Sequence, residues 1–265
     1  MVKKRLDVLV VDKNLIESRE QAQRAIMAGE ILINDIRITK PGTKVDDDSN
    51  IRYTGKAQPY VSRGGLKLKK AIDTFAIDFT DKIVIDIGAS TGGFTDCALK
   101  HGAQKVYSVD VGYGQLAWSL RNDSRVIVME RTNARGLTQD MFLEKVDIII
   151  MDVAFISITK IMPQLLQLIK NDGIIITLIK PQFEAGRENV GKKGVVKDPE
   201  IHKSVIRSVI SEAEKVGLYA KKLEHSPIRG PEGNIEFLLL LEANGKVEAD
   251  ENLINKTVEG SQQLR

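Results

Sequence analysis

The stretch Ile83-Val-Ile-Asp-Ile-Gly-Ala-Ser-Thr-Gly-Gly-Phe-Thr95 decides the fold of this chain. Its first five residues are apolar except for Asp86, and this pattern predicts a strand buried on both faces. The strand leads through a glycine-rich turn into a helical pattern. Doubly wound α/β folds bind nucleotides at such a corner, because it lies at the carboxyl end of a strand. We therefore expect a cofactor site at Asp86 and the turn that follows it.

The glycine spacing argues against two common nucleotide sites. A dinucleotide-binding turn needs G-x-G-x-x-G, and Ser90 stands where the second glycine is required. The chain also contains no G-x-x-x-x-G-K-[ST] phosphate loop. A tight turn at Gly92 and Gly93 without any ligand is the simpler alternative. The stretch resembles the first motif of methyltransferases that use S-adenosylmethionine (SAM), which implies that Asp86 and the turn hold the amino-acid end of SAM.

A second acid, Asp110, follows Gly88 by 22 residues and ends the next predicted strand. An acid at this position accepts the two hydroxyls of a ribose in dinucleotide-binding folds, and an adenosine ribose offers the same groups. Asn133 comes soon after the third predicted strand, where its amide is placed to read an adenine edge. The candidate cofactor residues are Asp86, Gly88, Ser90, Gly92, Gly93, Phe94, Asp110 and Asn133.

Apolar runs of strand length alternate with helical patterns after residue 58. This alternation predicts a parallel α/β sheet with helices on both faces. We expect one domain over residues 59–242, beginning with a helix that Ser62 caps, and a frayed polar tail over residues 243–265. The predicted strands are 83–87, 105–110, 126–129, 146–152, 173–179, 218–223 and 235–241.

Residues 1–58 form a different pattern, with two short helices and a hairpin. Ser18 and Gln21 match a capping box, Gly29 suits a helix end, and Asn34-Asp35 suits a hairpin turn. The pattern resembles the alpha-L RNA-binding motif of ribosomal proteins and pseudouridine synthases, although that family usually has glycine where Asp35 stands. The resemblance implies RNA contacts for Arg5, Arg19 and Lys40.

The charge is balanced overall but clustered locally. The chain has 39 basic and 36 acidic residues, yet the segment 51–70 holds six bases and no acid. A second basic cluster lies in the glycine-containing loop 185–197. Such clusters suit a polyanion, although a solvated surface is the commoner meaning of any single one. Further RNA-binding candidates are Arg63, Lys69, Lys70, Arg187, Lys192 and Lys193.

Composition also narrows the class of protein. One cysteine and three histidines without ligand spacing argue against a disulfide framework and against a metal site. No apolar run approaches the length of a membrane span, and acids follow the basic start too closely for a signal peptide. We expect a soluble cytoplasmic protein that does not bind membranes. The oligomeric state stays open.

Three charged residues lie at the ends of predicted apolar strands: Asp152, Lys180 and Glu236. Charges there are costly unless they are paired, so we expect them to pair with one another and with Lys67 from the preceding helix. Structural salt bridges are the alternative to catalysis. These four residues resemble the Lys-Asp-Lys-Glu set of the FtsJ-like ribose 2′-O-methyltransferases.

The whole chain resembles the TlyA family when the N-terminal pattern, Lys180–Gly186 and Gly191–Asp198 are added. The resemblance implies an α/β fold, with a Rossmann-like SAM-dependent methyltransferase sheet and a small N-terminal α+β RNA-binding domain. It also implies methylation of cytidine 2′-hydroxyls in ribosomal RNA, with free RNA or ribosomal subunits as the partner. Some members of the family carry a haemolysin label.

A ribose hydroxyl must lose its proton as it attacks the methyl group, and a lysine can take that proton only in its neutral form. We expect Lys180 to be this base, Lys67 to be the cation that favours its deprotonation, and Asp152 and Glu236 to orient both. Methylation of a base fits less well, because no Pro-Pro-Tyr turn follows Asp152 and the single cysteine, Cys97, lies elsewhere. A non-catalytic RNA-binding or ribosome-assembly factor is the main rival, and a haemolysin is the weaker one.

Overall fold

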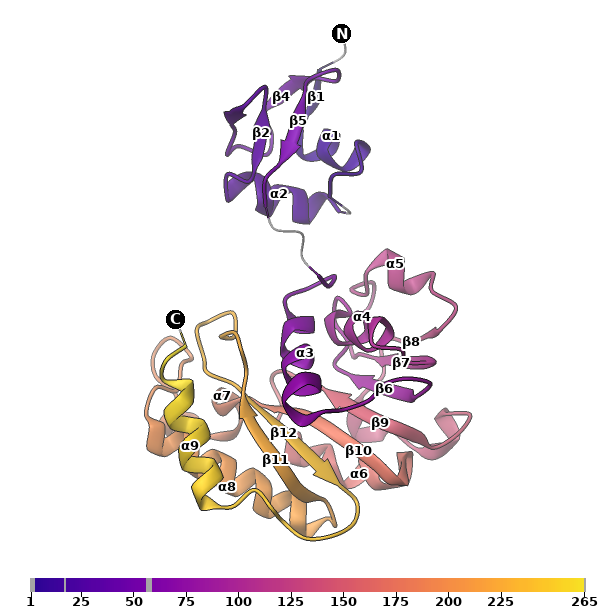
Figure 1. Cartoon of the computed structure of the whole chain (residues 1–265), viewed down its shortest axis with the longest axis vertical. Coiled ribbons are helices and arrows are strands. Elements are labelled where there is room, and N and C mark those ends of the chain that lie inside the picture. Colours follow the sequence, from indigo (N-terminus) through magenta and orange to yellow (C-terminus); the bar gives the residue numbers. More distant parts are fainter. Residues whose placement is uncertain (1–2, 17, 56–58, 265) are drawn as a thin grey trace. The chain divides into compact units, whose positions relative to one another are not determined.

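The computed structural model describes residues 3–16, 18–55 and 59–264, and the chain divides into two compact units, Met1–Gln58 and Pro59–Arg265 (Figure 1). The predicted domain boundary adjoins Gln58, which lies outside the described residues. Each unit has its own buried apolar core, and no core residue is shared between them. We describe each unit by itself.

The first unit packs two helices against two small sheets. Its core includes Leu6, Leu9, Ile26 and Ile31, which are at most 3% exposed. One sheet pairs β1 with β4 and the other has the order β3-β2-β5. The elements are β1 Lys3–Arg5, α1 Leu6–Asp12, α2 Arg19–Met27, β2 Ile31–Ile33, β3 Ile36–Arg37, β4 Lys44–Asp46 and β5 Ile51–Tyr53.

Two local predictions for this unit are confirmed. Ser18 caps α2, because its hydroxyl accepts a hydrogen bond from the Gln21 amide at 3.3 Å. The hairpin turns at Asn34 and Asp35, whose φ angles are 48° and 66°. Two left-handed residues make a type I′ turn, so Asp35 adopts the conformation for which glycine is the usual choice.

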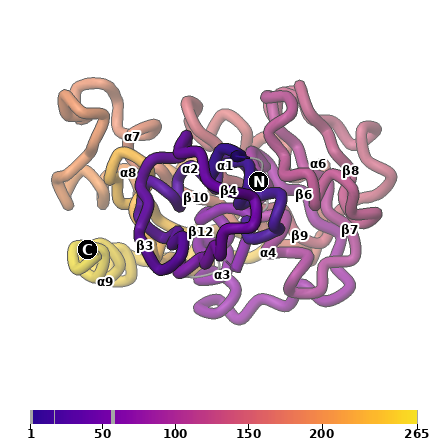
Figure 2. The backbone as a smooth tube through the Cα atoms, turned by 90° about the horizontal axis from the view of Figure 1, so that it is seen from above, coloured from indigo at the N-terminus to yellow at the C-terminus, as the bar shows by residue number. Residues whose placement is uncertain are grey.

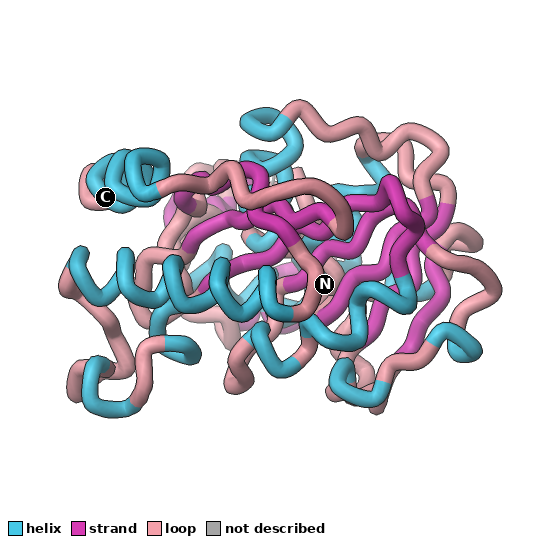
Figure 3. The backbone as a smooth tube through the Cα atoms, turned by 90° about the horizontal axis from the view of Figure 1, so that it is seen from below, coloured by secondary structure: helices cyan, strands magenta, loops and turns pink. Residues whose placement is uncertain are grey.

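The second unit is a seven-stranded sheet between two layers of helices, which Figure 3 shows in magenta and cyan. Its strand order is β11-β12-β10-β9-β6-β7-β8. Strands far apart in sequence lie side by side, such as β9 next to β6 (Figure 2). The strands are β6 Ile83–Ile87, β7 Lys105–Val109, β8 Val126–Met129, β9 Val146–Met151, β10 Ile169–Ile179, β11 Tyr219–His225 and β12 Phe237–Glu242.

One part of the predicted sheet is wrong. The sequence predicts a parallel sheet, but β12 runs antiparallel to both of its neighbours, β10 and β11. The short connection from β11 to β12 explains the reversal, because a parallel pair needs a crossover of a dozen or more residues. The start of β12 therefore lies at the edge where the parallel strands end.

Helices cover both faces, as the apolar strands require. Ile85 and Ile87 of β6 face one core and Val84 faces the other, each at most 1% exposed. Helices α6 Met162–Leu168 and α8 Pro199–Lys215 pack in the first core, and α3 Gly64–Phe75 and α4 Gly93–Lys100 pack in the second. The shorter elements are α5 Trp118–Arg121, α7 Pro181–Glu184, η1 Ala134–Gly136, η2 Gln139–Met141, η3 Ile158–Lys160 and η4 Arg187–Asn189.

Two features of the helices differ from the prediction. Residues 251–261 form a helix, α9 Glu251–Ser261, and not a frayed tail. The Asp250 side chain caps it, and Ile254 and Val258 are buried one turn apart in the core that contains α8. Ser62 does not cap α3: the helix begins after Arg63 without a side-chain cap, and the Ser62 carbonyl accepts a hydrogen bond from the Gly65 amide at 3.2 Å.

We predict that Val258→Asp lowers the free energy of unfolding by about 3 kcal/mol, because it buries an unpaired carboxylate. Val258 is fully buried. The control is Asn252→Asp, which adds the same charge at an exposed position of α9. Urea denaturation of the full chain compares the two variants. Equal stability of both would contradict the assignment of α9 to the core.

Candidate active site and RNA-binding residues

The ends of three neighbouring strands bring the predicted catalytic residues to one edge of the sheet. In the register of the sheet, Ile179 of β10 lies opposite Phe237 of β12, and Thr177 of β10 lies opposite Met151 of β9. The residue after Met151 is Asp152, the residue after Ile179 is Lys180, and the residue before Phe237 is Glu236. The reversal of β12 is what places Glu236 with the other two.

Lys67 from α3 joins these three residues, and we call Lys67, Asp152, Lys180 and Glu236 the tetrad. The Lys67 ammonium donates a hydrogen bond to Glu236 Oε2 at 2.5 Å and lies 3.6 Å from Asp152 Oδ2. Lys180 Nζ lies 2.5 Å from Asp152 Oδ1. The tetrad is thus a row of alternating charges that runs from Glu236 through Lys67 and Asp152 to Lys180.

The two lysines of the tetrad have different surroundings. Burial alone lowers the pKa of Lys67, but its attraction to Asp152 and Glu236 outweighs burial and raises the pKa. Lys67 therefore stays charged between its two carboxylates. Lys180 has Asp152 as its one ion-pair partner among the described residues, whereas Lys67 has two carboxylates. Lys180 is the better candidate for proton transfer.

The glycine turn packs directly against the tetrad. Gly88 has a φ of +85°, and a Cβ atom there would lie 2.7 Å from the Asp152 carbonyl oxygen. Any larger residue would push the turn away from Asp152. Gly92 has a φ of +97° at the start of α4, and Ser90 between them adopts a φ of 49°. The turn thus needs its glycines for conformation and for its approach to Asp152.

Asp86 is fully buried below this turn. Burial raises its pKa to about 7, which the hydrogen bond from the Thr95 hydroxyl opposes and the nearby carboxylates of Asp152 and Asp110 reinforce. The Thr95 hydroxyl donates to Oδ2 at 2.6 Å. Oδ1 has no hydrogen-bond partner among the described residues. A buried acceptor without a donor is costly in a closed core and suits a site that a ligand completes.

The other predicted cofactor residues have internal partners too. The Asp110 carboxylate accepts hydrogen bonds from the amides of Ser90 at 2.8 Å and Gly112 at 2.7 Å, so it joins the turns that follow β6 and β7. The Asn133 side-chain oxygen caps η1 by accepting the Arg135 amide at 3.1 Å. Each oxygen of the Asp110 carboxylate can accept a second hydrogen bond, and the side-chain amide NH2 group of Asn133 keeps its two N–H donors.

Phe94 was predicted to contact the cofactor, but its ring is 4% exposed and packs in the core with α3. Phe94 therefore packs between α4 and α3, and its contact with the cofactor stays a prediction. The helical position after the glycine turn explains this placement, because the buried face of α4 includes it.

The loop after Asp152 carries a residue that the sequence reasoning missed. Phe155 is 93% exposed and has a φ of +63°, which is strained for a bulky side chain. Its ring lies 5.3 Å from that of Phe183 in α7, measured between centroids. The signal in the sequence was an aromatic residue in a loop directly after a candidate catalytic residue.

The last part of the basic loop 185–197 is anchored to the rest of the second unit. Asn234 is 1% exposed, accepts the Val196 amide at 3.0 Å and donates to the Gly194 carbonyl at 2.9 Å. Asn234 was also missed; a polar residue two positions before Glu236 was the available signal. The basic candidates of this loop, Arg187, Lys192 and Lys193, are exposed.

Two RNA-binding candidates of the first unit are held by a buried acid. Asp7 is fully buried, accepts two hydrogen bonds from Arg5 at 2.9 Å each and accepts one from Arg19 at 3.0 Å. The side chains of Arg5 and Arg19 are still 47% and 54% exposed. Asp7 therefore orders both guanidinium groups at the surface. Lys40 is exposed.

The three RNA-binding candidates near the start of the second unit differ in their exposure and in their ionic partners. Arg63 is exposed. Lys69 pairs with Asp73 one turn along α3, and Lys70 lies 3.5 Å from Glu224. Internal acids partly offset the two lysines, so Arg63 is the stronger candidate of the three.

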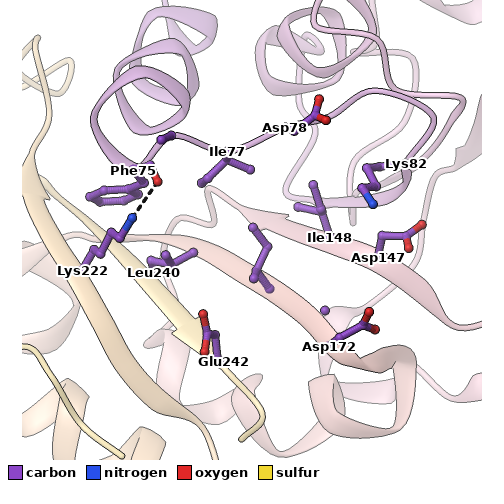
Figure 4. A pocket seen from close by; sticks show the side chains of 13 residues that line it. Phe75, Ile77, Asp78, Lys82, Asp147, Ile148, Asp172, Lys222, Leu240 and Glu242 are labelled. Atoms are coloured by element: carbon purple, nitrogen blue, oxygen red, sulfur yellow. Dashed lines mark hydrogen bonds between the residues drawn. The ribbon is translucent and has the colours of Figure 1, made fainter. Parts of the chain in front are cut away.

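A hollow of about 290 Å³ lies at the other edge of the sheet, where the parallel strands begin (Figure 4). Lys82, Asp147 and Asp172 line it, and the Lys222 ammonium donates to the Phe75 carbonyl at 2.7 Å. None of the predicted site residues lines this hollow. Across the described ranges, no helix is long and apolar enough to cross a membrane, and no cluster of metal-binding side chains occurs.

Comparison with known proteins agrees with this geometry. Residues 60–243 match the FtsJ-like methyltransferase family, and residues 4–51 match the S4 domain. YqxC of Bacillus subtilis, named as a candidate rRNA methyltransferase, is 52% identical over 95% of this chain and 90% of its own length. The 16S/23S rRNA (cytidine-2′-O)-methyltransferase TlyA of Mycobacterium tuberculosis is 43% identical over 89% of each chain.

A solved structure from Streptococcus thermophilus, described as a candidate haemolysin, is 43% identical. It covers 99% of this chain and 97% of its own, with a TM-score of 0.79. The match therefore extends over both units of the chain. An S4 domain followed by an FtsJ-like methyltransferase domain, with relatives of this identity and coverage, shows that the chain belongs to the TlyA family.

Proposed function

We propose that this chain transfers a methyl group from SAM to the 2′-hydroxyl of a cytidine ribose in ribosomal RNA. One observation carries the proposal: the tetrad forms a row of alternating charges directly beside the glycine turn. The names of the TlyA relatives indicate cytidine as the modified nucleoside and ribosomal RNA as the substrate. Because ribosomal RNA is made and assembled in the cytoplasm of bacteria, we place the protein there.

The chemistry assigns tasks to Lys180, Asp152 and Lys67. When bound, SAM would supply an electrophilic methyl group on a positively charged sulfur, which would leave as a neutral thioether. Lys180 first gives the proton of its ammonium group to water, and its neutral amine then accepts the proton of the 2′-hydroxyl as the ribose oxygen bonds to the methyl carbon.

Asp152 stabilises the ammonium group that forms on Lys180, and the charged Lys67 keeps Asp152 and Glu236 in place. Positioning of the two reacting groups contributes the largest share of such a rate enhancement. Each of the four groups lies next to an opposite charge, so the replacement of one changes the surroundings of its neighbours.

The residues of the glycine turn fit SAM. The unpartnered Asp86 Oδ1 offers an acceptor in a buried position, and glycine at position 88 lets the turn approach the Asp152 carbonyl closely. Asp110 retains free lone pairs for the ribose hydroxyls of SAM. No pyrophosphate needs to be bound, which agrees with Ser90 in place of a glycine.

The surface around the tetrad fits RNA. The 2′-hydroxyl distinguishes RNA from DNA, and RNA bases that leave their stack rest on aromatic side chains. Phe155 is an exposed aromatic ring three residues after Asp152, so we assign it to the target nucleotide. We assign phosphate contacts to two separate groups of residues. One group is Arg5, Arg19 and Lys40 in the S4 domain, and the other is the basic loop 185–197 of the second unit.

A non-catalytic RNA-binding factor is the rival function, and Lys180 separates the two. We predict that Lys180→Ala lowers kcat for methylation of unmodified ribosomal subunits by about 100-fold or more, because no other group takes the proton. RNA affinity should stay within about twofold, since RNA binding depends on other surfaces. Filter binding and transfer of labelled methyl groups measure the two quantities.

Lys256→Ala is the matched control, because Lys256 is an exposed lysine of α9 outside the tetrad. Equal activity of the two variants would exclude Lys180 as the base. Loss of RNA binding by Lys180→Ala would mean that Lys180 binds RNA and does not act as the base.

The S4 domain gives a second prediction. Arg19→Ala should reduce the slope of log affinity against log salt concentration by about 1, because one phosphate contact is lost. Arg24→Ala on the same helix is the control, since Arg24 is 66% exposed and pairs with Glu20 instead of Asp7. Fluorescence anisotropy with ribosomal RNA at several salt concentrations measures the slopes. Equal slopes for Arg19→Ala and the unmodified chain would remove Arg19 from the RNA contacts.

A further inference from the structure

We propose that Glu184 is a positioning residue for methyl transfer, which fixes the loop after β9 to the loop after β10 so that Asp152 and Lys180 stay together. This inference rests on the proposed function. The loop after β9 comprises residues 152–158, and the segment after β10 comprises residues 180–184, which end in the short helix α7.

Both oxygens of the Glu184 carboxylate accept hydrogen bonds from the loop after β9. Oε2 accepts the Ser157 hydroxyl at 2.6 Å, and Oε1 accepts the Ile158 amide at 2.9 Å. Burial raises the pKa of Glu184, which these two hydrogen bonds and Lys160 oppose. No ion pair of Glu184 within 4 Å occurs among the described residues, so its task is not charge neutralisation.

The two loops and their contacts close a ring. At one end, Lys180 Nζ meets Asp152 Oδ1 at 2.5 Å. At the other end, Glu184 binds Ser157 and Ile158. The chain itself connects the ends, through residues 152–158 on one side and 180–184 on the other. Loss of the Glu184 hydrogen bonds would therefore leave both loops free to move, and Asp152 and Lys180 would separate.

Phe155 shows that this ring holds a strained segment. A bulky residue at a φ of +63° costs free energy and persists only where its surroundings hold it. The side chain itself is 93% exposed, so the holding contacts must come from its loop and from Phe183. Phe183 and Glu184 are consecutive residues of α7, so one helical turn supplies both contacts.

The test compares Glu184→Ala with Glu184→Gln in the full chain, with Glu214→Ala as the control. Glu214 is an exposed glutamate near the end of α8, outside the proposed machinery. We expect Glu184→Ala to lower kcat for subunit methylation by about tenfold or more, because small misplacements of reacting groups are costly. Affinities for SAM and RNA should stay within about twofold, since neither is bound through Glu184.

Glu184→Gln keeps one acceptor and should recover part of kcat, whereas Glu214→Ala should match the unmodified chain. Ser157→Ala removes one partner, and in the Glu184→Ala background it should cause no further loss. A circular dichroism melt gives the folded fraction, to which each kcat is referred.

An unchanged kcat per folded molecule in Glu184→Ala overturns the inference. So does a loss of SAM affinity as large as the loss of kcat, or an additive loss in the double variant. If the unmodified chain itself transfers no methyl group to either ribosomal subunit, the proposed function fails instead, and the two failures are distinct.

Discussion

The arrangement of the tetrad depends on Lys67, whose ammonium group lies between Asp152 and Glu236. Two carboxylates that lie this close to each other and to an apolar core need a cation between them. Lys67 can reach both because β12 runs against its neighbours and starts where β9 and β10 end. Strand direction and charge pairing thus support each other, since a parallel β12 would place Glu236 at the far edge of the sheet.

The same edge joins the tetrad to the glycine turn. Gly88 lies so close to the Asp152 carbonyl that no side chain fits between them, and Asp110 ties the turns after β6 and β7 together. A methyl donor at the turn and a ribose at Lys180 would therefore meet at one place without any large movement of the sheet. The exposed Phe155, at a positive φ, follows Asp152 by three residues, and its ring lies next to that of Phe183 in α7.

Local patterns in the sequence predicted most of the fold, because strands and caps depend on neighbouring residues. The seven apolar runs became the seven strands, and Ser18 caps its helix. The direction of β12 was not predicted, since an apolar run does not show whether its strand lies parallel or antiparallel to its neighbours. Helix α9 was missed because its apolar stripe, which includes Ile254 and Val258, is thin among polar residues. The tetrad was named from strand ends and family resemblance. Phe155, Glu184 and Asn234 make contacts between loops, and local patterns do not show which loops meet.

The most direct test of the account is the chemical position of the transferred methyl group. Purified chain and labelled SAM are incubated with ribosomal subunits that lack the modification, and the RNA is digested to nucleosides for mass spectrometry. The account predicts that the label appears as 2′-O-methylcytidine, because the tetrad activates a ribose hydroxyl. Label on a cytosine or any other base would contradict it, since that product requires a different catalytic set from Lys67, Asp152, Lys180 and Glu236.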